Sequence, residues 1–123
     1  MSNWLPFHIH TIYSLLDGLI QPKKLAKKIK EFGYQYCTIT DHGNVSGAVN
    51  FSSAMLKEGI IPVLGNEFYT FETDGKRDMD HTVVLAKNLQ GWKKLLKLTT
   101  LSNKQFYYKP RIKLEQIADL YDK

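Results

Sequence analysis

Short apolar runs alternate with helical patterns along this sequence, and the alternation restricts the possible folds more than any other feature. The strand-like runs are residues 6–10, 36–40, 60–64 and 82–86, and residues 67–71 either continue the third run or form another strand. Helical patterns occupy residues 21–32, 47–58, 90–102 and 114–121. Strands that alternate with helices favour parallel strand–helix–strand units. The sequence therefore predicts an α/β fold.

The segments between these elements carry turn signals. Residues 72–80 are charged and contain Asp74 followed by Gly75, a pair typical of turns. Residues 103–113 are rich in aromatic side chains and include Pro110. We expect both segments to be loops.

Composition is that of an ordinary globular domain. The chain has 123 residues, 43% of them hydrophobic, which is enough for one domain with a core. A single cysteine, Cys37, excludes an internal disulfide. No apolar run approaches the roughly 20 residues of a membrane span, and the N-terminus lacks a signal-peptide pattern. We expect a cytoplasmic protein that does not enter a membrane.

Two histidines, His8 and His10, stand at alternate positions of the first strand-like run. Alternate residues of a strand point to the same face, so the two imidazoles are expected to lie side by side. Imidazole is the commonest metal ligand among side chains. Taken alone, the pair is better interpreted as two surface or hydrogen-bonded histidines than as a metal site.

Further candidate ligands follow the other predicted strands. Function in parallel α/β folds gathers at the carboxyl ends of strands, where Asp41, His42 and Glu67 fall. His81 is an exception, because it precedes its strand. Mixed imidazole and carboxylate ligands suit Zn²⁺, Mn²⁺ or Fe²⁺ better than Ca²⁺ or Mg²⁺. The candidate residues are His8, His10, Asp17, Asp41, His42, Glu67 and His81.

Charge is distributed unevenly. The chain has 17 basic and 12 acidic residues, a net charge of +5, and residues 82–114 contain no Asp or Glu. Lysines and aromatic residues alternate through this stretch. Such a surface suits a nucleic-acid phosphate backbone, and it equally suits a solvated helix face above core aromatic residues.

An ordered series of motifs resembles the PHP (polymerase and histidinol phosphatase) family, in the branch at the N-terminus of bacterial replicative DNA polymerase III alpha subunits. The motifs are residues 7–18 (FHIHTIYSLLDG), 38–49 (TITDHGNVSGAV), 59–67 (GIIPVLGNE), 81–88 (HTVVLAKN), 91–92 (GW) and 106–112 (FYYKPRI). The last is specific to the polymerase branch. The resemblance covers essentially the whole chain.

The resemblance implies a distorted (β/α) barrel whose mouth holds a cluster of divalent metal ions. It implies that residues 1–123 form roughly the first half of a single PHP domain. The implied metal ligands are His8, His10, Asp17, His42, Glu67 and His81. Asp41 is implied to orient His42 or a water molecule. Later ligands of the family pattern lie outside this sequence, so we expect one or two ions, weakly held.

The resemblance implies a role in DNA replication, either as a metal-dependent phosphoesterase with 3′–5′ exonuclease activity or as a non-catalytic module docking on the rest of a polymerase. A small-molecule phosphatase of the histidinol-phosphate type is a third reading. The polymerase active-site carboxylates lie far downstream in the family, so this chain alone is not expected to polymerise DNA. Expected partners are DNA, the remainder of a polymerase or a complementing chain, and a second copy. We predict that Lys109 and Arg111 contact DNA phosphates.

Overall fold

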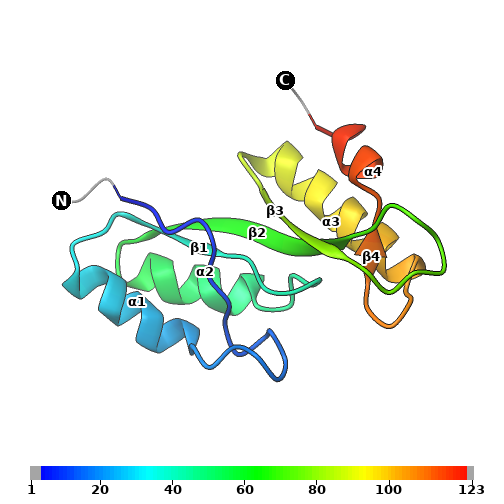
Figure 1. Ribbon diagram of the computed structural model, residues 1–123. Helices are drawn as coiled ribbons and strands as arrows, with labels where there is room; N and C mark the ends of the chain where they lie inside the picture. The colour runs from blue at the N-terminus through cyan, green and yellow to red at the C-terminus, as the bar shows by residue number, and fades with distance from the viewer. Residues whose placement is uncertain (1–3, 122–123) are drawn as a thin grey trace.

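The computed structural model describes residues 4–121 and shows the predicted α/β fold (Figure 1). Its four strands are β1 (Tyr36–Ile39), β2 (Ile61–Thr70), β3 (Asp80–Leu85) and β4 (Arg111–Ile112). Its four helices are α1 (Pro22–Glu31), α2 (Ala48–Lys57), α3 (Leu89–Lys104) and α4 (Leu114–Ala118). Strands and helices alternate except between β2 and β3.

The long strand β2 organises the sheet. It joins the two segments that the sequence left open as one strand or two. Strands β1 and β4 pair with it in parallel, and β3 pairs with it antiparallel, from Gly65 opposite Leu85 to Thr70 opposite Asp80. A Cβ at Gly65 would lie 2.7 Å from the Val84 carbonyl oxygen, so only glycine permits this close approach of β3.

The predicted first strand and one predicted loop are corrected by the structure. Residues 6–10 form no strand and no ladder with their neighbours in the described chain. The Thr40 N–H donates to the Ile9 carbonyl (2.9 Å), but the Ile9 N–H donates to the Thr40 side-chain hydroxyl (2.9 Å), so a side chain replaces the next ladder bond. Conversely, β4 lies inside the predicted loop 103–113.

Two hydrophobic clusters hold the helices on the sheet. One joins α1, α2 and β1 around Phe51, Met55 and Ile39. The other joins α3, β2 and β4 around Phe68, Leu95 and Ile112. Burying each of these large side chains contributes roughly 1.5–3 kcal/mol, so the two clusters fix both ends of β2.

Helix lengths exclude a membrane span in the described part of the chain. The longest helix, α3, has 16 residues, fewer than the roughly 20 needed to cross a bilayer. No helix among residues 4–121 is both long and apolar enough to do so.

Candidate metal centre

The two faces of strand β2 have different neighbours: one packs on helix α3, and the other faces the candidate ligands. Successive residues of a strand point to opposite faces. Phe68 belongs to the cluster around α3, and Asn66 donates a hydrogen bond to Thr99 on that helix. Glu67 therefore points the other way, where histidines surround it. Two backbone bonds fix its position: the Glu67 N–H donates to the Asp41 carbonyl (3.1 Å), and the Gly43 N–H donates to the Glu67 carbonyl (2.9 Å).

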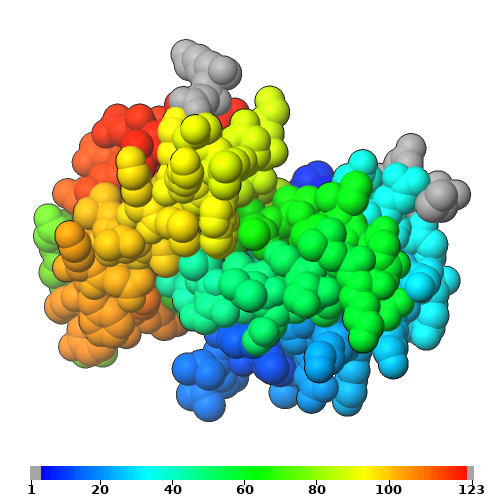
Figure 2. Space-filling model, turned by 180° about the vertical axis from the view of Figure 1, so that it is seen from behind, coloured from blue at the N-terminus to red at the C-terminus, as the bar shows by residue number. Residues whose placement is uncertain are grey.

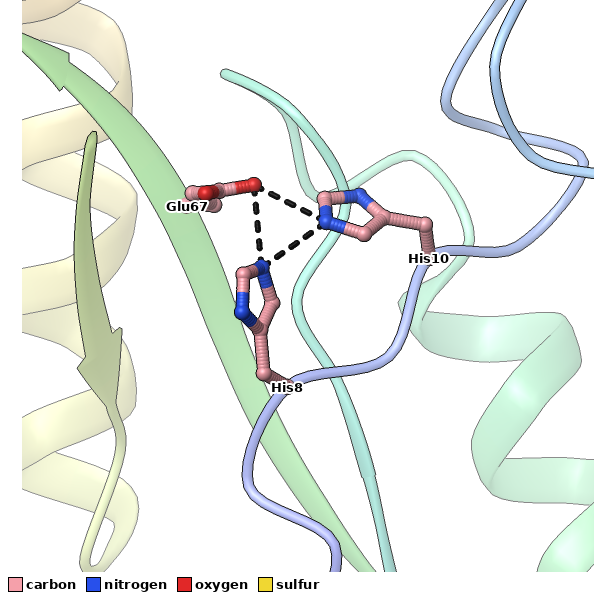
Figure 3. A group of neighbouring side chains, drawn as sticks. All are labelled: His8, His10 and Glu67. Atoms are coloured by element: carbon pink, nitrogen blue, oxygen red, sulfur yellow. Dashed lines mark hydrogen bonds and ion pairs between the residues drawn. The ribbon is translucent and has the colours of Figure 1, made fainter. Parts of the chain in front are cut away.

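His8 and His10 converge on Glu67, as Figure 3 shows. Glu67 Oε2 lies 3.1 Å from His8 Nε2 and 2.9 Å from His10 Nε2. The two Nε2 atoms are 2.8 Å apart. Both imidazoles thus meet at one point even though residues 6–10 form no ladder.

His42 lies between two carboxylates. Its Nδ1 is 3.0 Å from Glu67 Oε2, and its Nε2 is 2.9 Å from Asp17 Oδ2. Its ring stacks on that of His10, with centroids 4.1 Å apart. A neutral imidazole has one lone pair, so His42 can bind one ion while its other nitrogen donates to the opposite carboxylate.

The structure corrects the expectation that His81 precedes its strand: His81 is the second residue of β3. Because β3 runs antiparallel to β2, its first residues lie beside the carboxyl end of β2, with His81 opposite Tyr69. His81, His42 and Glu67 have ligand atoms within 4.8 Å of one another. A place near the start of β3 would lie far from the other ligands if β3 were parallel to β2. Because β3 is antiparallel, this place brings His81 to the other histidines.

Asp17 is held by a compact loop. The Gly18 N–H and the Asp17 N–H both donate to the Ser14 carbonyl (2.8 and 3.1 Å), and the Ile12 N–H donates to the Ile20 carbonyl (3.0 Å). A Cβ at Gly18 would lie 1.8 Å from the Thr11 carbonyl oxygen. Only glycine fits there, and the loop places Asp17 beside His42.

Asp41 is bonded to two hydroxyl residues, Thr11 and Ser14. It is buried and accepts hydrogen bonds from the Thr11 N–H (2.6 Å), the Thr11 hydroxyl (2.8 Å) and the Ser14 hydroxyl (2.7 Å). The Ser14 oxygen lies 3.1 Å from His10 Nδ1 and accepts the His42 N–H (3.1 Å). Asp41 thus acts through Ser14 on the His10 ring and on the His42 backbone, and its orientation of the His42 imidazole or of a water molecule stays a prediction.

Sequence reasoning missed Thr11 and Ser14. Because Ser14 gives its proton to Asp41, it accepts one from His10 Nδ1, which leaves the His10 Nε2 lone pair facing Glu67. Their only signal was two hydroxyl residues between the histidines and Asp17. Their complete burial is visible only in three dimensions.

The donor atoms fit a divalent cation. Three imidazole nitrogens lie within 3.1 Å of the buried Glu67 Oε2, yet none among the described residues is aligned to donate a hydrogen bond to it. His42 Nδ1 is likewise buried without a hydrogen-bond partner in that part of the chain. Bonds of about 2.0–2.1 Å to one ion would separate adjacent ligand atoms by about 2.9–3.4 Å, close to the spacings found here.

Three overlapping groups of ligand atoms make up this candidate metal centre. They are His8, His10 and Glu67; His10, Asp17 and His42; and His42, Glu67 and His81. Because His42, His10 and Glu67 are each shared between two groups, the six residues form one continuous cluster.

Burial lowers the pKa of His10. Loss of hydration, followed by repulsion from His42, holds the pKa below its ordinary value of 6.5, and Glu67 opposes the shift. A lower pKa keeps the imidazole neutral, the form that binds metals. Cys37 plays no part, because burial in the α1–α2–β1 cluster raises the pKa of its thiol to about 12.

Lys109 and Arg111 differ in their surroundings. Lys109 Nζ donates to the Tyr69 hydroxyl (3.2 Å) and stays partly open to solvent. The Arg111 guanidinium lies between the Phe71 and Tyr107 rings, 4.0 and 4.6 Å from their centroids, and donates to the Lys76 and Gln105 carbonyls. We call this group, with Asp74 at 3.9 Å, the arginine clamp. Phosphate contact stays a prediction for both residues, and the clamp contacts count against it for Arg111.

Comparison with known proteins identifies a matching family and several similar sequences. A family model described as the PHP domain matches residues 6–123. DNA polymerase III subunit alpha of Aquifex aeolicus is 41% identical over 128 aligned residues, covering 93% of this chain and 11% of that protein. The corresponding subunit of Helicobacter pylori strain J99 is 43% identical over 111 residues, covering 85% of this chain and 9% of that protein. The chain thus spans about a tenth of the length of these relatives.

Solved structures share the fold. A protein described as a metal-dependent phosphoesterase from Bifidobacterium adolescentis superposes with a TM-score of 0.59 at 20% identity, covering 85% of this chain and 36% of that one. An amidohydrolase from Chromobacterium violaceum gives 0.57 at 19% identity, covering 82% and 35%. These two likenesses support the predicted partial (β/α) barrel.

Proposed function

The chain belongs to the PHP domain family and is homologous to the N-terminal region of DNA polymerase III subunit alpha, and from this premise we propose that it is a divalent-metal-dependent phosphoesterase that removes nucleotides from DNA 3′ ends. The observation that carries the proposal is the buried Glu67 oxygen with three imidazole nitrogens within 3.1 Å and no aligned hydrogen bond. A carboxylate so surrounded is stabilised best by a cation.

The six residues His8, His10, Asp17, His42, Glu67 and His81 would hold the metal. Bound divalent ions would supply Lewis-acid polarisation of a phosphoester and a more acidic water molecule. The protein supplies the geometry: Ser14 orients His10, the Gly18 loop positions Asp17, and β2 fixes Glu67. We expect Zn²⁺, Mn²⁺ or Fe²⁺, because imidazole ligands outnumber carboxylates.

DNA is the substrate that the surroundings favour. Lys109 lies against Tyr69, which in turn stacks on His42. An ammonium at that position would contact a phosphate oxygen of a bound strand, because lysine carries three donors and Tyr69 uses one. The basic stretch of residues 82–114, which contributes to the net charge of +5, also favours a polyanionic substrate.

Degradation of a labelled oligonucleotide tests the proposal. A 5′-labelled single strand should shorten from its 3′ end when Mn²⁺ or Zn²⁺ is added to chelator-treated protein, and not before. His42→Ala and Glu67→Gln should abolish this shortening. Glu115→Gln, which alters an exposed carboxylate on α4, is the matched control and should not.

Three outcomes would count against the proposal. The first is an elemental analysis that finds no bound metal in the purified wild type, or as much metal in His42→Ala as in the wild type. Shortening that survives Glu67→Gln would indicate a contaminating nuclease. Hydrolysis of histidinol phosphate without attack on the oligonucleotide would support the small-molecule reading instead.

A second candidate function is docking onto the remainder of a polymerase, and one surface favours it. The loop that carries Asp17 exposes Leu15, Leu16 and Leu19 almost completely, and it stands out from the molecule (blue in Figure 2). Leu16 has a positive φ of 64°, which a branched side chain adopts only at a cost in backbone free energy. Clustered apolar side chains held outward in this way are typical of an interface.

Light scattering tests the docking surface. The wild-type chain should self-associate as its concentration rises, because nothing covers these leucines in the described structure. A variant with Leu15, Leu16 and Leu19 changed to Ser should stay monomeric. Val49→Ser, which alters a single exposed apolar residue on α2, serves as the control. A monodisperse wild-type monomer at all concentrations would remove the support for this candidate.

A further inference from the structure

Tyr69 lies where the candidate metal centre meets the segment that carries Lys109. It follows Glu67 by two residues on β2 and so points to the same side. Its ring stacks almost parallel on His42, with centroids 5.5 Å apart and planes at 13°. The His81 ring lies 4.9 Å from it at 56°. One buried aromatic ring therefore contacts two of the candidate ligands.

Lys109 reaches the same tyrosine from another part of the chain. Its Nζ donates to the Tyr69 hydroxyl (3.2 Å) and lies 4.3 Å from the ring centroid. A tight turn presents it: the Tyr107 N–H donates to the Lys109 carbonyl, and Tyr108 has a φ of 61°. The Arg77 guanidinium packs on the Tyr108 ring and stabilises this turn. A non-glycine residue at positive φ costs free energy, which tertiary contacts must offset.

Close packing leaves Tyr69 little freedom to move. It is only 8% exposed. Gly43 has a φ of 63°, and a Cβ there would lie 3.4 Å from the Pro110 ring and 3.6 Å from the Tyr69 ring. The positive φ favours glycine here, and the two distances show that the backbone next to His42 lies directly beside Pro110 and Tyr69. The Lys109 segment, the ring and the His42 segment pack as one unit.

We propose that Tyr69 is a positioning residue with two separable parts. Its ring sets the angles of the His42 and His81 imidazoles, and its hydroxyl holds the Lys109 ammonium beside the centre. Held there, Lys109 has two donors left for the oxygens of a phosphodiester. The inference rests on the proposed function and adds a residue that the family-derived ligand set does not contain.

Separate substitutions distinguish the two parts. Tyr69→Phe keeps the ring and removes the hydroxyl, so Mn²⁺ affinity measured by calorimetry should stay within twofold of wild type. The affinity for a fluorescein-labelled single-stranded oligonucleotide, measured by anisotropy, should fall about 3- to 10-fold, as it should in Lys109→Met. Tyr69→Leu removes the ring, and its Mn²⁺ affinity should fall about 10-fold.

The double variant tests most directly whether the Tyr69 hydroxyl acts through Lys109. If the hydroxyl acts through Lys109, Tyr69→Phe combined with Lys109→Met should bind the oligonucleotide no more weakly than Lys109→Met alone. Lys109→Met should also reduce the salt dependence of binding by about one counterion. Tyr34→Phe, whose ring contacts Trp4 and Phe32 instead of histidines, is the matched control.

Specific outcomes would overturn the inference. Losses that add in the double variant, or wild-type oligonucleotide affinity in Tyr69→Phe, would show that the hydroxyl does not act through Lys109. Unchanged Mn²⁺ affinity in a folded Tyr69→Leu variant would refute the role of the ring. If Tyr69→Leu does not fold, the oligonucleotide affinity of Tyr69→Phe decides the inference. Absence of cleavage by the wild type would refute the proposed function alone, because every arm here measures binding.

Discussion

The candidate metal centre and the arginine clamp both place charged groups beside β2, and they differ in how well those groups are satisfied. In the clamp, the guanidinium stacks between two rings and donates to two carbonyl oxygens. In the centre, the buried Glu67 Oε2 has nitrogens all around it and no aligned hydrogen bond among the described residues. The clamp is complete as it stands, whereas the centre is arranged for a ligand.

This difference separates stability from function. A buried charge that makes all its contacts contributes to folding and is costly to remove. A cluster of lone pairs without protons between them repels itself until a cation binds, so it costs stability in the metal-free protein. Substitutions in the two regions should therefore affect different measurements, and the following variants test that separation.

Glu67→Gln should have the largest effect. It removes the charge that three histidine rings share, so Mn²⁺ or Zn²⁺ affinity measured by calorimetry should fall at least about 100-fold. The rise in unfolding temperature on adding metal should disappear with it, while the metal-free protein should remain at least as stable as wild type. A metal-free variant much less stable than wild type would show that Glu67 serves the fold instead.

Arg111→Met should show the opposite pattern. It removes stacking on two rings and two hydrogen bonds, so urea unfolding should show a loss of about 2–3 kcal/mol. Metal affinity should be unchanged. Lys93→Met, an exposed cation on α3, is the control and should change stability by less than about 0.5 kcal/mol. A large loss of metal affinity in Arg111→Met would mean that the two regions are coupled.

Ser14→Ala should weaken the centre without removing a ligand. The change deletes the hydroxyl that links Asp41 to His10 Nδ1 and to the His42 N–H. We expect metal affinity to fall about 10-fold by calorimetry. Ser102→Ala removes a buried hydroxyl bonded within α3 and should leave metal affinity unchanged. Equal metal affinities in the two variants would show that the hydroxyl does not tune His10.

Acidification should have the smallest effect of the four changes, a modest loss of stability in the metal-free protein. Because the pKa of His10 is lower in the folded protein than its ordinary value of 6.5, the unfolded chain binds more protons as the pH falls below that value. Stability of the metal-free protein should therefore be full above pH 6.5 and decline as the pH falls through and below it. Urea unfolding with chelator at pH 7.5 and 5.5 measures this, and His10→Gln should reduce the decline. Greater stability at pH 5.5 than at pH 7.5 would contradict a lowered pKa for His10 in the folded protein.

The sequence predicted the candidate ligands better than their setting. Periodicity located every helix, and motif order pointed to His42 and Glu67, because ligands next to strand ends leave a local signature. It did not reveal that β3 runs antiparallel, which depends on pairing between distant residues, so His81 looked misplaced. The roles of Ser14 and Tyr69 were invisible for the same reason, since each arises from contacts more than 25 residues apart in sequence.

Anomalous diffraction from a crystal of the chain grown with Mn²⁺ tests the central claim most directly. The account predicts a peak within about 2.0–2.3 Å of Glu67 Oε2 and of imidazole nitrogens from His8, His10 or His42, and its loss in Glu67→Gln crystals. Peaks only at surface carboxylates elsewhere, or none in a crystal whose histidines keep this arrangement, would contradict a metal centre at these residues.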